Sequence, residues 1–134
     1  MTQELTNKLL TSAINARQKS YAPYSCFSVG AALMTEDGKI YTGANIENAA
    51  HTPTVCAERN AFFTAIHDGA RRFCAIAVVG GNCGQEINAF CPPCGVCRQV
   101  MSEFCDGRFE ILLYDGRQVR TLTLDDLLPE RFVL

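Results

Sequence analysis

The sequence predicts a three-layer α/β/α fold, in which helices cover both faces of a mixed five-stranded sheet. First, 134 residues with 48% hydrophobic content suffice for one buried core and not for two, so we expect a single domain over residues 1–134. Second, the patterns along the chain follow the order helix, hairpin, helix, strand, helix, strand, strand. Third, helices between strands favour parallel pairing in the middle of a sheet, whereas hairpins favour antiparallel edges.

The first third of the chain predicts a helix followed by a hairpin. Apolar residues recur at helical spacing over residues 3–19, and Pro23 then disfavours helical geometry at Ala22. Residues 27–34 and 40–45 have the patterns of two strands. The Asp37-Gly38 pair between them supplies the positive φ that a tight hairpin requires.

The remaining two thirds alternate between helix and strand. The expected elements are a helix over residues 56–67, a strand over 73–80, a helix over 94–104, strands over 109–114 and 118–123, and a brief helical turn over 125–128. The run at 73–80 is apolar throughout, which is typical of a strand buried on both faces. We expect the helices at 56–67 and 94–104 to begin at the same end of the sheet.

Composition and charge exclude several classes of protein. The net charge is −2 and the chain has no block of Lys or Arg, so binding to a nucleic acid polymer is not expected. The first residues lack the pattern of a signal peptide, and no apolar run approaches the roughly 20 residues of a membrane span. We therefore expect a cytoplasmic protein without a membrane partner, whose eight cysteines are mostly reduced.

Three cysteines predict a catalytic zinc site. Cys94 and Cys97, three positions apart, form a natural clamp for a soft cation, and Cys56 on another element would supply a third thiolate. Three thiolates leave the fourth tetrahedral position of zinc open for water or substrate, as in catalytic sites. Glu58 lies two residues from Cys56 and can move protons at the bound water without ligating the metal.

Two other interpretations of the cysteines stay open at this point. Cys91 extends the clamp to C-x2-C-x2-C, part of an iron–sulfur pattern, but Met101 stands where that pattern needs a fourth cysteine. A closed structural site of four thiolates that includes Cys91 is also possible, although it would leave Glu58 and Arg59 without a task. We expect Cys91 to lie near the site without being a ligand. The other cysteines are interpreted as small buried residues (Cys26, Cys74 and Cys105) and as a loop thiol (Cys83).

A polar pair follows the second expected strand. The amide of Asn45 and the carboxylate of Glu47 can bracket a pair of sugar hydroxyls, because one donates and accepts while the other accepts. The alternative is a turn in which asparagine side chains bond to their own backbone. Of the two histidines, His67 lies at the far end of a helix, and His51 is expected to line the pocket without binding metal.

Five motifs together resemble the small, homotetrameric, zinc-dependent cytidine deaminases. They are residues 21–25 (YAPYS), 27–32 (FSVGAA), 45–49 (NIENA), 56–59 (CAER) and 93–99 (PCGVCRQ), and the similarity runs along effectively the whole chain. The resemblance implies the family's α/β/α fold and one Zn²⁺ per subunit, bound by Cys56, Cys94 and Cys97.

The resemblance also implies roles around the metal. These are Glu58 as proton shuttle, Asn45 and Glu47 on the ribose, Phe27 packed against the nucleoside, backbone of Ala57 at the base, Arg59 bonded to the ligand sulfurs, and Phe132 stacked on the base in a neighbouring subunit. The implied sites therefore lie at the interfaces of a homotetramer.

The activity that the resemblance implies is hydrolysis of cytidine, and of 2′-deoxycytidine, to the uracil nucleoside and ammonia in pyrimidine salvage. A zinc-bound hydroxide attacks C4 while Glu58 moves the protons. One departure bears on substrate breadth, because His51 stands where the family usually has Tyr. The alternatives are a deaminase of a cytosine-nucleoside antibiotic such as blasticidin S and, below it, a non-catalytic zinc-binding module, against which the intact Glu58 argues.

Overall fold

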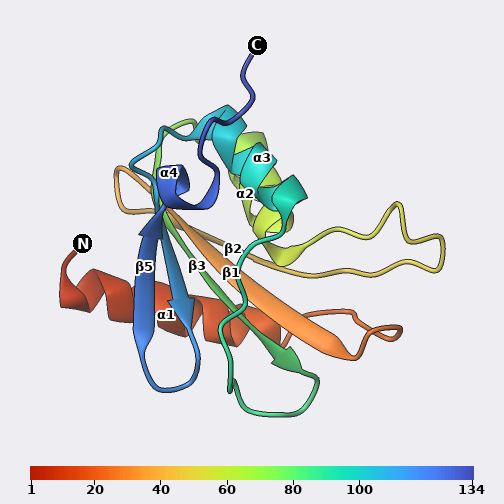
Figure 1. Ribbon diagram of the computed structural model, residues 1–134. Helices are drawn as coiled ribbons and strands as arrows, with labels where there is room; N and C mark the ends of the chain where they lie inside the picture. The colour runs from red at the N-terminus through yellow and green to blue at the C-terminus, as the bar shows by residue number, and fades with distance from the viewer.

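Five strands in the order β2-β1-β3-β4-β5 form the central sheet of the computed structural model, which describes residues 1–134 (Figure 1). The strands are β1 (Phe27–Thr35), β2 (Ile40–Ala44), β3 (Phe73–Asn82), β4 (Glu110–Tyr114) and β5 (Val119–Thr123). The helices are α1 (Gln3–Arg17), α2 (Ala57–His67), α3 (Gly95–Phe104) and α4 (Leu124–Leu127). The predicted fold class is confirmed: a mixed five-stranded sheet with helices on both faces.

Strand direction within the sheet was predicted only in part. β3 and β4 are parallel, but β1 runs antiparallel to both of its neighbours, β2 and β3. The reason is that α2 carries the chain from β2 over β1 to β3, so the parallel strands β2 and β3 are not adjacent. β4 and β5 form the second antiparallel pair, at the other edge.

The two faces of the sheet are covered by different helices (Figure 1). On β1, Ala32 and Met34 pack with residues of α1, whereas Ala31 and Leu33 pack with residues of α2 and α3, as strand alternation requires. No helix of the chain combines the length and the apolar character that crossing a membrane requires.

Close backbone contacts set the helices on the sheet. A Cβ at Gly30 would lie 2.1 Å from the carbonyl oxygen of Ala13 in α1, and a Cβ at Gly43 would lie 2.4 Å from that of Ala57 in α2. Both glycines therefore allow a helix to approach a strand more closely than any other residue would. Helix α1 ends at Arg17, two residues earlier than expected, because the chain tightens through bonds from Lys19 N to Ala16 O and from Ser20 N to Arg17 O.

An aromatic contact fixes α2 against α3. The ring of Phe62, fully buried on α2, stacks on Phe104 of α3 with a centroid separation of 6.0 Å. It also contacts the rings of Phe73 and Phe109. Truncating a buried Phe to Ala typically costs about 3–5 kcal/mol, so this cluster holds the two helices firmly in register. Their N-termini consequently meet at one end of the sheet.

Candidate metal centre and active site

Cys56 and Cys94 stand at the N-cap positions of α2 and α3. Both have extended backbone geometry, with φ of −69°, and neither side chain caps its own helix. Cys97 follows in the first turn of α3 and is fully buried. The three Sγ atoms lie within 4.8 Å of one another, and those of Cys56 and Cys94 are 4.0 Å apart.

This cluster fits a zinc ion. Tetrahedral coordination with Zn–S bonds of about 2.3 Å separates the sulfurs by about 3.8 Å, close to the separation observed. Two helix N-termini direct their positive dipole ends at the three sulfurs, which favours thiolates. The structure thus brings together the three cysteines that sequence analysis selected. Cys56 and Cys94 are 38 residues apart in the sequence and lie at the N-termini of two different helices.

Arg59 supplies further positive charge to the cluster. Its Nη2 lies 3.4 Å from the Sγ of Cys56 and from the carbonyl oxygen of Thr54. The pKa of Cys56 falls to about 5, because the Cys97 thiol donates to its sulfur and the Arg59 guanidinium stabilises the anion. The pKa of Cys97 is raised correspondingly, since its proton is held by Cys56.

Glu58 is a buried carboxyl beside this cluster. Only 5% of the residue is exposed, and its position in the first turn of α2 keeps it next to the sulfurs. Burial raises its pKa to about 7, and the negative charge of Cys56 acts in the same direction. A carboxyl in this setting exchanges a proton near neutral pH, which is what general acid–base chemistry requires.

Cys91 lies close to the cluster but outside it. A Cβ at Gly80 would meet the Cys91 Sγ at 2.7 Å and the Phe27 ring at 3.0 Å, so the thiol packs in the corner between β3 and Phe27. Burial raises its pKa to about 11, which keeps it protonated. The four-thiolate and iron–sulfur interpretations, which both use Cys91, therefore lack geometric support.

The polar pair after β2 is held in place by the start of β1. Glu47 accepts bonds from the amides of Tyr24 (2.9 Å) and Ser25 (3.1 Å) and from the Ser25 hydroxyl, which lowers its pKa. Asn45 accepts from the amide of Val29 at 2.8 Å and donates to the carbonyl of Phe27 at 2.9 Å. Each side chain keeps unused hydrogen-bonding capacity, one N–H in Asn45 and further lone pairs in Glu47.

A hollow of about 400 Å³ adjoins this pair. The residues that line it are Tyr24, Ser25, Glu47, Asn48, His51 and Thr54. His51 has a positive φ of 64° and its ring makes an edge contact with Tyr24, with centroids 6.4 Å apart. The alternative interpretation of this segment as a self-bonded turn holds for Asn48, whose side chain accepts from the amide of Ala50.

Two segments have surroundings that no local sequence pattern specifies. Residues 21–25 follow the end of α1, as predicted, and Tyr24 and Ser25 in addition bond to Glu47; no local pattern signals the contact from Ser25, which spans 22 residues. Phe132 is 66% exposed near the C-terminus, which projects beyond α3 (Figure 1), and its carbonyl oxygen accepts a bond from Gln99 Nε2 at 3.4 Å.

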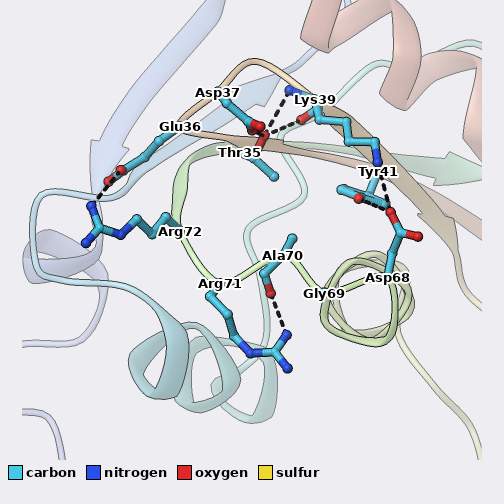
Figure 2. A pocket seen from close by; sticks show the side chains of 10 residues that line it. All are labelled: Thr35, Glu36, Asp37, Lys39, Tyr41, Asp68, Gly69, Ala70, Arg71 and Arg72. Carbon is cyan, nitrogen blue, oxygen red and sulfur yellow. Dashed lines mark hydrogen bonds and ion pairs between the residues drawn. The ribbon is translucent and has the colours of Figure 1, made fainter.

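A larger hollow, of about 670 Å³, lies at the C-terminal end of α2, whereas the cysteine cluster lies at its N-terminal end (Figure 2). Its lining is polar and charged, and the charged groups pair with one another. Lys39 Nζ lies 2.9 Å from Asp68 Oδ2, which also accepts from the Tyr41 hydroxyl, and Arg72 lies 3.8 Å from Glu36. No buried polar atom without a partner faces this hollow.

Comparison with known proteins places the cluster in context. Residues 3–113 match the family model described as "Cytidine and deoxycytidylate deaminase zinc-binding region". A cytidine deaminase of Sporosarcina psychrophila is 48% identical over 126 residues, covering 93% of this chain and 89% of the relative. A crystal structure of cytidine deaminase from Burkholderia pseudomallei superposes with a TM-score of 0.87 at 46% identity, covering 98% of this chain and all of that one. A blasticidin-S deaminase of Bacillus cereus is 32% identical over 107 residues, covering 78% of this chain and 76% of the relative.

Proposed function

Because this chain belongs to the cytidine and deoxycytidylate deaminase family, we propose that it hydrolyses cytidine and 2′-deoxycytidine to uridine and deoxyuridine, releasing ammonia. The observation that carries the proposal is a buried carboxyl, Glu58, beside three converging thiols at two helix N-termini. A non-catalytic zinc module would have no reason to retain a buried ionisable group of this kind, since burying one is costly.

Cys56, Cys94 and Cys97 would hold one zinc ion per subunit, and when bound the ion supplies Lewis-acid activation of the hydrolytic water. The Glu58 carboxylate accepts a proton from the water and delivers it to N3 of the cytosine ring. The water oxygen joins C4, and Glu58 then takes the second proton from that oxygen and passes it to the exocyclic nitrogen. The C4–N bond breaks, ammonia leaves and the uracil nucleoside remains. The atoms of water and the cytosine nucleoside are thus all found in the uracil nucleoside and ammonia.

Positive charge near the sulfurs makes this chemistry feasible. Three thiolates leave a Zn²⁺ site with net negative charge, which by itself makes a bound water less acidic than a histidine-rich site would. The dipoles of α2 and α3 and the guanidinium of Arg59 offset part of that charge. Arg59 would therefore act through the ligand sulfurs.

Substrate recognition is assigned to the start of β1 and the end of β2. Glu47 and Asn45 would contact the ribose with the capacity that their backbone bonds leave unused, Phe27 would pack against the nucleoside, and backbone of Ala57 would contact the base. Binding energy from the sugar positions the reacting ring, so free cytosine should be a very poor substrate. Equal rates on cytosine and cytidine would contradict a sugar-binding role for this pair.

The assembly that suits this chain is a homotetramer in which Phe132 acts on a neighbouring site. Support comes from the exposed apolar end of the chain, where Phe132 and Val133 are 66% and 68% exposed. Refolding Glu58→Ala together with Phe132→Ala should then create hybrid sites with both residues intact, and activity above either parent. A fully active monomer in sedimentation would exclude this arrangement.

The decisive assay follows the loss of the cytosine chromophore with cytidine, deoxycytidine and blasticidin S, with zinc measured on the same sample. Turnover of cytidine well above that of blasticidin S is expected, in line with identities of 48% and 32% to the respective relatives. The reverse preference would assign the antibiotic instead, and His51 in the hollow would then be the first residue to test. We place the reaction in pyrimidine salvage in the cytoplasm, where the ligand thiols stay reduced.

A further inference from the structure

Arg98 connects the metal-binding loop to the C-terminal part of the chain. It follows the ligand Cys97 on α3 and is partly buried. Its Nε donates to the carbonyl of Pro93 at 2.7 Å, and its Nη1 donates to the carbonyl of Leu127 at 2.8 Å. Pro93 immediately precedes the ligand Cys94, and Leu127 is the last residue of α4. One guanidinium thus bonds to both segments.

The segment beyond α4 has few attachments: the Arg131 guanidinium has a buried nitrogen, Nη1, but that atom makes no hydrogen bond. Residues 129–134 form no helix or strand, and one hydrogen bond joins them to the rest of the chain, from Gln99 Nε2 to the carbonyl of Phe132 at 3.4 Å. Gln99 is the neighbour of Arg98 on α3. The side-chain hydrogen bonds to the end of α4 and to the C-terminal segment therefore come from two consecutive residues of the helix that carries Cys97.

We propose that Arg98, assisted by Gln99, is a positioning residue that fixes the C-terminal segment relative to the loop of Cys94. This inference rests on the proposed function, in which Phe132 contacts the substrate of a neighbouring subunit. The helix that holds the metal ligands of one site then also orients the aromatic ring for the next site. A flexible segment would have to be ordered on each binding event, and a fixed one avoids that entropic loss.

The absence of tryptophan from the chain allows a direct test of segment mobility. The Phe132→Trp variant is the only source of tryptophan fluorescence, so acrylamide quenching reports on the mobility and exposure of that position. Adding Arg98→Gln should raise the quenching constant at least about two-fold, because both carbonyl contacts are lost. Arg98→Lys should have a smaller effect in the same direction, since one ammonium cannot reproduce the planar fork.

A matched control comes from strand β5. The Arg120 guanidinium packs on the Phe90 ring at 4.1 Å, and no hydrogen bond joins it to the C-terminal segment, whose one bond comes from Gln99. Arg120→Gln should leave the quenching of Phe132→Trp unchanged. Should Arg98→Gln fail to fold, as judged by thermal melting, Gln99→Ala replaces it, because it removes only the contact to the Phe132 carbonyl.

Kinetics on the zinc-loaded enzyme provide a second measurement. With Phe132 present, Arg98→Gln should raise KM for cytidine several-fold with a smaller fall in kcat, because it acts through a binding residue. Combining it with Phe132→Ala should raise KM no further than Phe132→Ala alone, since both changes remove the same contribution.

Unchanged quenching, or effects on KM that simply add, would overturn the role of Arg98. Absence of cytidine turnover in the wild-type protein would overturn the proposed function instead, and the quenching experiment would still decide the positioning role.

Discussion

The two ends of α2 carry carboxyl groups in different electrostatic states. At the C-terminal end, Lys39 and Asp68 are more than half exposed and paired, and the pKa of Asp68 is lowered by its partners Tyr41 and Lys39. At the N-terminal end, Glu58 is buried, has no cationic side chain within salt-bridge distance, and has its pKa raised. Exposed pairs add little to stability, whereas a buried ionisable group reduces it.

The comparison indicates which feature identifies a site. The hollow at the C-terminal end of α2 is larger, about 670 Å³ against about 400 Å³, but its charges neutralise one another (Figure 2). The N-terminal end combines converging thiols with a carboxyl that the fold removes from water. A buried carboxyl with a shifted pKa beside thiols at a helix N-terminus, and not the volume of a depression, marks the reactive end of this molecule.

The largest expected difference between the two ends is in turnover. Glu58→Ala should fold, retain zinc and lose about 10³-fold or more of kcat, because both proton transfers pass through this carboxyl. Asp68→Ala, the control at the other end of the same helix, should stay within about two-fold of wild type. The measurements are the steady-state deamination rate and the zinc content of each variant. A Glu58→Ala variant that keeps a tenth of wild-type turnover would contradict the role of Glu58 as proton shuttle.

Metal content distinguishes the cysteines of the reactive end from their neighbour. Cys56→Ser, Cys94→Ser or Cys97→Ser should lose zinc or stability, since each removes one of the three proposed ligands. Cys91→Ser should keep one zinc per chain, because its thiol lies outside the cluster. The measurement is metal analysis after dialysis against a weak chelator. Zinc loss in Cys91→Ser would favour a closed site of four thiolates.

The burial of Glu58 should appear as a pH-dependent loss of stability in zinc-free protein. Its folded pKa of about 7 exceeds the ordinary 4.5, so the folded state binds more protons between these values and its stability falls as pH rises through them. Glu58→Gln removes this loss and should raise the free energy of unfolding at pH 8 by up to about 3 kcal/mol. At pH 4 the two proteins should unfold alike in urea. An equal gain at both pH values would show that ionisation is not the cause.

The smallest effect is expected from the exposed pair, with the opposite sign. The folded pKa of Asp68 lies below the ordinary 3.8, so its contribution is present above that value and is lost as pH falls through the folded pKa. Asp68→Asn should lower the melting temperature at pH 7 by no more than a few degrees, and added salt should shrink the difference. A salt-insensitive drop of ten degrees would mean that this end of the molecule carries a larger structural role than its exposure indicates.

Local patterns in the sequence were sufficient for the elements and for the metal clamp. The Asp37-Gly38 turn, the apolar run of β3 and the amphipathic face of α1 depend on neighbours a few residues away, so their boundaries agree with the structure within one or two residues. Cys94 and Cys97 are likewise one helical turn apart, and their proximity follows from helix geometry alone. These features were determined by the sequence itself.

The tertiary structure decided what depends on distant segments. β1 lies between β2 and β3 because the crossover through α2 spans it, which no local pattern specifies. Burial of Glu58 requires α2 to pack on the sheet and against α3, and the backbone bonds of Asn45 and Glu47 require β1 to lie alongside. Hydrophobic burial and desolvation act between surfaces that meet only after folding. The sequence therefore determines which reactive groups are present, and their packing in the tertiary structure determines the pKa of each.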